Sequence, residues 1–381
     1  MVGFVPIQML IPSQQRVSTF TSVSYEQGVA AHPLRPDAYH HLLFPQLYTP
    51  KLSPTTVGEY RRRLFKKWER EGFFQSQDAP VAWLYRQEGD GYYFEGWVGG
   101  FLVEDYRAGR IRKHENILSD KAHHIVEYFQ QVHLNGSPVL VIHAPFSEER
   151  GIRSAVSNRP PFLSFLDEVG IRHTIWSVGC EELKELQEAF HRIATVYIGD
   201  GHHRCHAYDH YYRGKHGKAI MAFAVSSDQV RVFPFHRLIH PLSRLEYSVL
   251  EALFASYFGA AVDDDIPLGA VRLSGSEVGI CWDGKVRIYD VTCLTGLPVE
   301  QVDEVLGEFR KGTAIGVSYL NGRLSADELM RRTRDAQGAL IILPPVAIQR
   351  IFEYADRGKT LPPKATWIEP KMRSGLFLHR L

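Results

Sequence analysis

The sequence predicts an α/β fold of mixed α+β type, in which helices flank a central mixed sheet and a smaller C-terminal α+β subdomain follows. Three observations support this prediction. Two alternating apolar segments meet at a glycine-rich turn, a strand–helix–strand order follows, and the pattern changes to short strands and helices after residue 242. We therefore expect one region at residues 1–242 and a second at residues 243–381.

The first elements follow from local patterns. Residues 1–55 are rich in Pro, Ser, His and Tyr and predict irregular segments. SPTTVGEYRRRLFKKWEREGFF (53–74) predicts a helix whose basic run we interpret as a solvated face. Residues 81–103 alternate around a Gly-Asp-Gly turn and predict a β-hairpin. A polar helix follows the hairpin, and SPVLVIHA (137–144) predicts a buried strand.

The next elements are predicted to extend the sheet. RHTIWSV (172–178), CEELKELQEAFHRI (180–193) and TVYIG (195–199) predict a strand, an amphipathic helix and a second strand. KAIMAFAVSS (218–227) and VRVFPFHRLI (230–239) predict paired strands joined by a polar turn. Beyond them, helices are expected at 243–258, 298–310 and 325–335, before a Pro-rich, basic tail.

Composition limits the classes of partner. The 44 Lys and Arg residues nearly cancel the 43 Asp and Glu residues, so we expect small or specific partners and neither nucleic acid nor a membrane surface. The four cysteines are scattered and predict no disulfide framework. Because the N-terminus lacks a basic leader and no long uncharged apolar run occurs, we expect a cytoplasmic protein.

The segment TVYIGDGHHRCHAYDHYY (195–212) carries the strongest chemical signal. A strand that ends at Gly-Asp-Gly and passes into a helix leaves backbone N–H groups free at the positive end of the helix dipole. Gly201, His202, His203 and Arg204 can then bind an anion such as phosphate. Asp200 is placed to hold Mg²⁺ or to accept a proton from an attacking hydroxyl group.

Two other interpretations of this segment stay open. His202, His206 and His210 recur every four residues beside Cys205, which is a spacing that can supply zinc ligands. Alternatively, Asp200 only caps the helix and the histidines bind backbone groups.

Further candidate residues lie elsewhere in the chain. In RIRKHENI, Glu115 stands next to cations and His114, and it is expected to stay ionised as a general base or metal ligand, or to belong to a surface charge cluster. FPFHRLI supplies His236 and Arg237, and LPPKATWIEPK supplies Lys364 and Lys371.

These four pieces, in this order, resemble the domain-of-unknown-function family 1015. The resemblance rests on RKHENI, YIGDGHHRCHA, FPFHRLI and LPPKATWIEPKMRSGL, and it covers almost the whole chain. This chain departs from the family pattern at Cys205 and His206, which weakens the zinc interpretation, and a PPYD-like N-terminal segment is hard to find.

The Asp-Gly-His-His-Arg element also resembles the phosphate-binding motif of ParB/sulfiredoxin-like proteins, including free serine kinases. This resemblance implies ATP or ADP and Mg²⁺ as cofactors, and transfer of a phosphoryl group to a small hydroxyl compound such as serine. It implies Glu115, Asp200 and His202 as catalytic residues. We expect Gly201, His202, His203 and Arg204 of the motif to hold the phosphates of the nucleotide. The remaining nucleotide-binding residues are expected to be His114, His236, Arg237 and Lys364.

Two alternative functions stay open beside the kinase. One is a regulatory protein that binds a nucleotide or phosphometabolite without turnover, and the other is a metal-dependent hydrolase. The oligomeric state is also open, a homodimer included.

Overall fold

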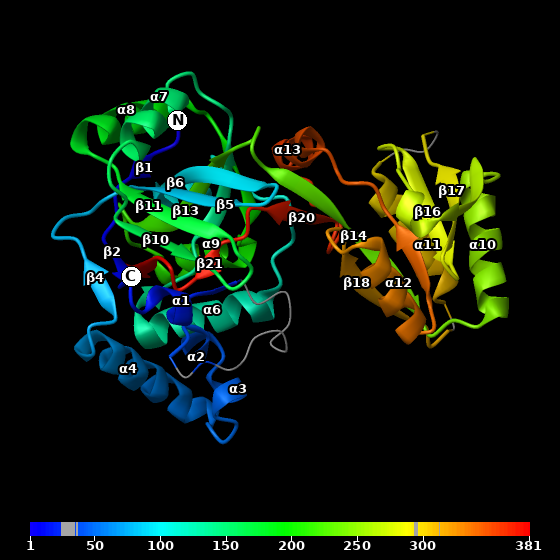
Figure 1. The fold of residues 1–381 in the computed structure, drawn as a ribbon, viewed down its shortest axis with the longest axis horizontal. Coiled ribbons are helices and arrows are strands. Elements are labelled where there is room, and N and C mark those ends of the chain that lie inside the picture. The colour runs from blue at the N-terminus through cyan, green and yellow to red at the C-terminus, as the bar shows by residue number, and fades with distance from the viewer. Residues whose placement is uncertain (24–34, 36, 293–295, 312) are drawn as a thin grey trace. The chain divides into compact units, whose positions relative to one another are not determined.

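A computed structural model describes residues 1–23, 35, 37–292, 296–311 and 313–381 of the chain. The chain forms two compact units (Figure 1). The first unit contains Met1–Val230 and Pro370–Leu381, and the second contains Arg231–Glu369. The second unit therefore begins twelve residues before the predicted boundary at 242/243, and the end of the chain belongs to the first unit.

The first unit contains helices and strands over most of its length. Its helices are α1 (Val17–Phe20), α2 (His40–Leu43), α3 (Pro45–Tyr48), α4 (Pro54–Arg70), α5 (Val103–Arg107), α6 (Ser119–Val132), α7 (Glu149–Ser157), α8 (Cys180–Arg192) and α9 (His202–Tyr211). Its strands are β1 (Phe4–Val5), β2 (Met9–Pro12), β3 (Ser22–Val23), β4 (Phe74–Ser76), β5 (Trp83–Gly89), β6 (Tyr92–Leu102), β7 (Ile111–Arg112), β8 (Leu134–Asn135), β9 (Val139–His143), β10 (Leu163–Leu166), β11 (Arg172–Ser177), β12 (Val196–Asp200), β13 (Ala219–Ser226), β21 (Arg373–Ser374) and β22 (Leu378–Arg380).

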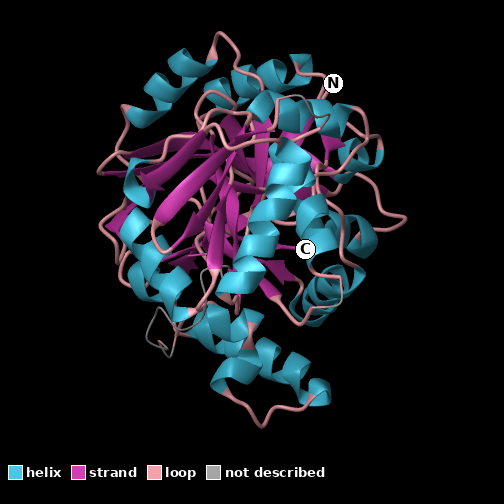
Figure 2. Cartoon of the chain, turned by 90° about the vertical axis from the view of Figure 1, so that its right-hand side faces the viewer, coloured by secondary structure: helices cyan, strands magenta, loops and turns pink. Residues whose placement is uncertain are grey.

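The main sheet of this unit is mixed. Within the described residues its strand order is β10-β11-β5-β6-β13-β9-β12-β7, with β1 also paired to β6. Most neighbours are antiparallel, but β13 runs parallel to β9, and β12 runs parallel to β7. Helices α7 and α8 lie on one side of these strands, and α6 and α9 lie on the other (Figure 1). Figure 2 shows the helices and strands of the whole chain by type. The apolar strand β13 is buried at every position, and its neighbours β6 and β9 occupy both of its edges.

The C-terminal residues close the first unit. Strand β22 lies between β2 and β8, and β21 pairs with β3. The fully buried Arg373 of β21 forms ion pairs with Asp167 at 3.0 Å and Glu168 at 2.9 Å. These contacts hold the segment around Lys371 in a fixed position within the unit.

The second unit is built around its own sheet, whose described strands follow the order β15-β17-β16-β19-β14-β18, with β20 also paired to β14. Its strands are β14 (Arg231–His240), β15 (Asp263–Pro267), β16 (Glu277–Trp282), β17 (Lys285–Asp290), β18 (Gly316–Asn321), β19 (Ala339–Ile342) and β20 (Thr366–Glu369). Its helices are α10 (Arg244–Phe258), η3 (Leu268–Ala270), α11 (Pro298–Phe309), α12 (Ala326–Asp335) and α13 (Ile348–Asp356).

The predicted mixed α/β fold class is confirmed, with a large mixed sheet and further antiparallel sheets. The hairpin at 81–103 is confirmed as β5 and β6, which pair from Gly89 opposite Tyr92. The predicted pairing of 218–227 with 230–239 is wrong, because both edges of β13 are occupied and β14 joins the sheet of the second unit instead. Part of the N-terminal segment, residues 24–34 and 36, lies outside the described residues.

None of the described helices combines the length and the apolar character that crossing a membrane requires. The described cysteines, Cys180, Cys205 and Cys281, are free thiols. The fourth, Cys293, lies outside the described residues.

The central strand β6 depends on a glycine at position 96. A Cβ atom there would overlap the carbonyl oxygen of Ala224 on β13 and lie 2.9 Å from the Phe223 ring. We expect Gly96→Ala to lower the free energy of unfolding by about 2–3 kcal/mol or more, as overpacking does in tight cores. Urea unfolding measures this change.

The matched control is Gly151→Ala in α7, where no atom lies within 4 Å of the added Cβ. Because alanine favours a helix over glycine, this control should be neutral or gain up to about 1 kcal/mol. Equal stability of the two variants would contradict the close approach of β6 and β13.

Candidate functional site

The predicted site residues around positions 115 and 200 come together where two parallel strands end. Strands β7 and β12 are paired in parallel, with Ile111 opposite Val196. Their carboxyl ends therefore lie at the same edge of the sheet, where β7 leads into the loop 113–118 and β12 leads into α9. His114 and His202, 88 residues apart in sequence, become neighbours in this way.

Two hydrogen bonds tie the loop to the first turn of α9. The backbone N–H of His114 donates to Nε2 of His202 at 3.4 Å, and that of Leu118 donates to Nε2 of His203 at 3.0 Å. Each imidazole therefore accepts a hydrogen bond at Nε2 and carries its own proton on Nδ1 when it is neutral. Both histidines of the motif thus fix the position of the loop that carries Glu115.

The start of α9 requires glycine at position 201. Gly201 precedes the helix with φ = 97°, in the left-handed region that favours glycine. A Cβ atom at this position would also lie 2.7 Å from Nε of Arg204. The absence of a side chain therefore lets the Arg204 guanidinium fold back over the strand–helix junction.

Asp200 lies between two cations at this junction. Its Oδ1 accepts a hydrogen bond from Nζ of Lys371 at 2.8 Å, and its Oδ2 accepts one from the Arg204 guanidinium at 2.6 Å. Burial alone would raise the pKa of this carboxyl group, but Lys371 and Arg204 hold it well below its usual range. Asp200 is thus an ionised anchor for two cations, and as a weak base it is poorly suited to take a proton from a hydroxyl group.

The junction combines unpaired N–H groups with positive charge. Within the described part of the chain, the backbone N–H groups of His202, His203 and Arg204 donate to no acceptor, and the helical series begins with the N–H of Cys205. The carboxylate of Asp200 and its two cationic partners sum to a net charge of +1. Free N–H groups at the positive end of a ten-residue helix, next to this charge, can bind an anion.

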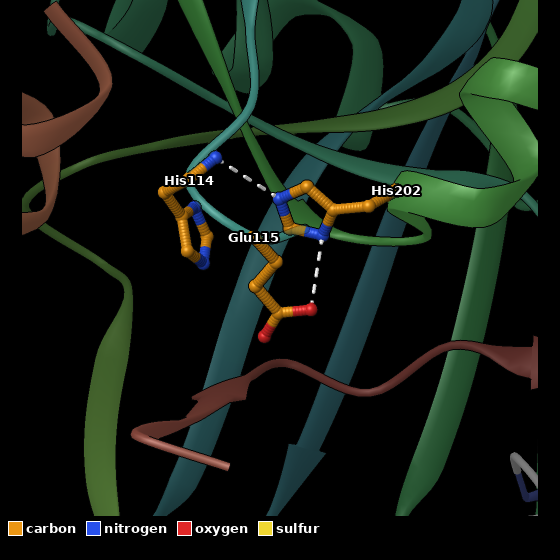
Figure 3. A group of neighbouring side chains, drawn as sticks. All are labelled: His114, Glu115 and His202. Carbon is orange, nitrogen blue, oxygen red and sulfur yellow. Dashed lines mark hydrogen bonds and ion pairs between the residues drawn. The ribbon is translucent and has the colours of Figure 1, made fainter. Parts of the chain in front are cut away.

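His114, Glu115 and His202 form a cluster beside the junction (Figure 3). Nδ1 of His202 lies 3.5 Å from Oε2 of Glu115, and the rings of His114 and His202 meet edge to face with centroids 4.5 Å apart. Both imidazoles are buried, whereas 36% of the Glu115 side chain is exposed. Glu115 is therefore the member of the cluster that solvent or a substrate can reach.

Burial keeps the two imidazoles of this cluster neutral. It lowers the pKa of His114 to about 3, with a further decrease from His202 and smaller opposing effects of Glu115, Asp200 and the Ile198 backbone. It also lowers the pKa of His202 to about 3, against the opposing effect of Asp200. At neutral pH, His202 therefore directs a neutral Nδ1–H toward the carboxylate of Glu115.

The residues around Asp200 do not fit a Mg²⁺ ion. Both carboxylate oxygens already accept hydrogen bonds from cations, and Lys371 and Arg204 would repel a dication placed between them. Asp200, which the sequence interpretation assigned to Mg²⁺, instead pairs with Lys371 and Arg204 in this structure. The lysine that reaches this site is Lys371, whereas the sequence interpretation selected Lys364 from the same tail.

His236, Arg237 and Lys364, which the sequence interpretation assigned to the nucleotide site, lie in the second unit. The guanidinium of Arg237 is fully buried, pairs with both carboxylate oxygens of Asp303 and donates to the carbonyl oxygens of Phe235 and Lys364. Nδ1 of the buried His236 accepts a hydrogen bond from the backbone N–H of Leu343 at 3.2 Å.

The zinc pattern of His202, His206 and His210 is not assembled by α9. His202 is buried and faces Glu115, whereas His206 and His210 are half-buried, and the ring of His210 lies near His123 of α6. Burial raises the pKa of the Cys205 thiol to about 12, so this cysteine is a poor metal ligand. The described residues group His202 instead with His114 and Glu115.

The model of the family described as "Protein of unknown function (DUF1015)" matches residues 13–308, so the chain belongs to this family. Among curated proteins none matches the chain.

Three solved structures show a weak similarity to this chain. A free serine kinase mutant in complex with ADP has 15% identity and a TM-score of 0.40, over 73% of this chain and 92% of that chain. A conserved hypothetical protein from Pyrococcus furiosus has 15% identity and a TM-score of 0.38, over 73% and 95%. C-terminally truncated SbnI from Staphylococcus aureus has 12% identity and a TM-score of 0.41, over 71% and 82%. Similarities at this level support no argument about the activity of this chain.

The buried His236 predicts an acid-sensitive second unit. Burial, with help from Arg237, lowers the pKa of this imidazole to about 4, below the usual value of about 6.5. The stability that comes from burying a neutral His236 is fully present above about pH 6.5. It is lost as the pH falls toward 4, because over this range the unfolded chain binds a proton at this imidazole and the folded chain does not. We expect a cost on the order of 3 kcal/mol over this range.

Urea unfolding at about pH 7, pH 6 and pH 5 measures this effect. Because other buried histidines such as His114 and His202 remain, His236→Gln should make the dependence less steep without removing it, and His216→Gln, at an exposed position, should leave it unchanged. The same slope in the wild type and in His236→Gln would contradict the buried neutral state of His236.

Proposed function

We propose that this protein transfers a phosphoryl group from ATP or ADP to a small hydroxyl compound. One observation carries the proposal. The junction of β12 and α9 presents free N–H groups, Arg204 and Lys371 to an anion, and Glu115 lies beside it, with Oε2 3.5 Å from Nδ1 of His202. An anion site next to a positioned carboxylate is what phosphoryl transfer needs, because this reaction depends on positioning and on stabilising charge.

The donor phosphates are proposed to bind at the first turn of α9. The N–H groups of His202, His203 and Arg204 would donate to the phosphate oxygens, and Arg204 and Lys371 would neutralise their charge. Nε of Arg204 is buried and has no acceptor among the described residues, so this guanidinium has donor capacity left beyond Asp200. The resemblance of the Asp-Gly-His-His-Arg motif to that of free serine kinases supports a nucleotide as the donor.

The acceptor hydroxyl group is proposed to face Glu115. As its oxygen bonds to the terminal phosphorus, the bond from phosphorus to the bridging oxygen breaks, and the leaving nucleotide keeps that electron pair. Glu115 accepts the hydroxyl proton. His202 positions Glu115 through its neutral Nδ1–H, and the half-exposed carboxylate can meet an acceptor from solvent. The same resemblance supports a small acceptor such as serine.

The proposed base is tested by Glu115→Gln, which keeps the shape of the side chain but cannot accept the proton. We expect kcat to fall by about 10²–10⁴-fold, while the affinity for ADP stays within about threefold of the wild type. Phosphorylated product is measured with ATP or ADP and a mixture of small hydroxyl compounds, and ADP binding by calorimetry.

The matched control for this test is Glu127→Gln, at an exposed glutamate of α6, which should keep full activity. Wild-type activity in Glu115→Gln would contradict the assignment of the base. Wild-type protein that binds nucleotide and never forms product would instead support the regulatory, non-catalytic alternative.

The proposed phosphate site is tested by Lys371→Met and Arg204→Met. Since hydrogen bonds to charged groups contribute about 1.5–3 kcal/mol, each variant should bind ADP about 10–100-fold more weakly. Lys67→Met, at an exposed lysine of the basic run on α4, serves as the control and should bind ADP normally. If Lys67→Met weakens binding and Lys371→Met does not, the phosphates bind at α4 and not at α9.

A further inference from the structure

Among the described residues, the side chain of His114 in the cluster beside the junction makes no hydrogen bond of normal geometry, although the Ile198 backbone lies close enough to affect its pKa. His114 is 1% exposed, and neither of its ring nitrogens has a hydrogen-bond acceptor or donor of normal geometry among the described residues. Buried polar atoms in native proteins are almost always paired with protein, water or an ion. The unpaired imidazole of His114 therefore indicates that this position binds something from outside the chain.

The neighbours of His114 indicate what that ligand is. Ligand atoms of His114, Glu115 and His202 all lie within 4.8 Å of one another, and the three side chains lie side by side (Figure 3). Two imidazole nitrogens with one carboxylate oxygen are a donor set that suits zinc and other borderline transition metals, whereas Mg²⁺ prefers oxygen ligands alone. We infer that His114, Glu115 and His202 form a binding site for a divalent transition metal ion.

Some charges around the cluster favour a bound cation, and others oppose it. The carboxylates of Glu115 and Asp200 favour positive charge at His114, whereas Lys113 and Lys371 oppose it at His202. Asp200 is itself paired with Lys371 and Arg204, so Glu115 supplies the unpaired negative charge of the site. The affinity of the site for a metal ion is therefore expected to depend strongly on Glu115.

Binding also changes one contact of His202. Its Nδ1, which faces Glu115, would bind the metal, and the ring proton would move to Nε2. With a proton on Nε2, His202 can no longer accept the hydrogen bond from the His114 backbone N–H, which at 3.4 Å is already long. The ligation of two imidazoles and a carboxylate replaces this one weak bond.

This inference goes beyond phosphoryl transfer and does not depend on it. Because Glu115 belongs both to the proposed metal site and to the proposed catalytic machinery, the two roles are tested by different measurements. Metal binding is measured in the absence of nucleotide and acceptor, so a failure of the proposed kinase activity leaves the result on the metal unchanged.

The test uses the untagged full chain, freed of metal by a chelator and then dialysed. Zn²⁺ is titrated by calorimetry, and Co²⁺ is titrated by its visible absorption, which reports the coordination geometry. We expect one ion per chain with a Kd below about 10 μM. His114→Ala and Glu115→Gln should each weaken binding by about 100-fold or more, beyond the 10–100-fold typical of residues that only support metal ligands.

The control is the His206→Ala/His210→Ala double variant, which removes the other histidine pair of the motif and should bind as the wild type does. Glu115→Gln changes a half-exposed side chain and is expected to fold, so the test does not depend on His114→Ala alone. Wild-type affinity in both His114→Ala and Glu115→Gln would overturn the inference. Loss of the ion in the double variant alone, or no binding below about 100 μM in the wild type, would also overturn it.

Discussion

The parallel pairing of β7 with β12 is the constraint on which the site depends. Parallel neighbours end at the same edge of a sheet, so the loop after β7 and the helix after β12 must lie side by side. Two backbone–imidazole hydrogen bonds then set the distance between them. If this short ladder were antiparallel, Glu115 would lie at the opposite edge from the free N–H groups of α9.

A second constraint is the balance of charge around Asp200. This carboxylate positions Arg204 from the next turn of the chain and Lys371 from 171 residues away, and it stays ionised because both cations surround it. Lys371 is fixed in turn by Arg373, whose buried pairs with Asp167 and Glu168 anchor the end of the chain in the first unit. The tail thus contributes to the site through folding as well as through its charge.

The parts of this site that were predictable from sequence are local. The Gly-Asp-Gly sequence between an apolar strand and a helix predicts the junction, and the hairpin at 81–103 follows from alternation around a tight turn. The resemblance implied that Glu115 acts together with the Asp200–Arg204 motif. The β7–β12 pairing that places Glu115 beside His202 is a contact between distant segments, which no local pattern indicates.

The features that the sequence could not predict are contacts and burial that depend on how distant parts of the chain come together. Lys364 and Lys371 are equivalent by local pattern, and only the return of the tail through β21 selects Lys371. The strand at 230–239 has the same apolar character as its predecessor, but both edges of that predecessor are occupied. The unpaired imidazole of His114 is likewise a property of burial that no spacing indicates.

A crystal structure of the protein with ADP tests the central claim most directly. The account predicts phosphate oxygens within hydrogen-bonding distance of the backbone N–H groups of His203 and Arg204, with Lys371 beside them and Glu115 facing the outer phosphate. ADP bound elsewhere, with no phosphate at the start of α9 at a saturating concentration, would contradict it.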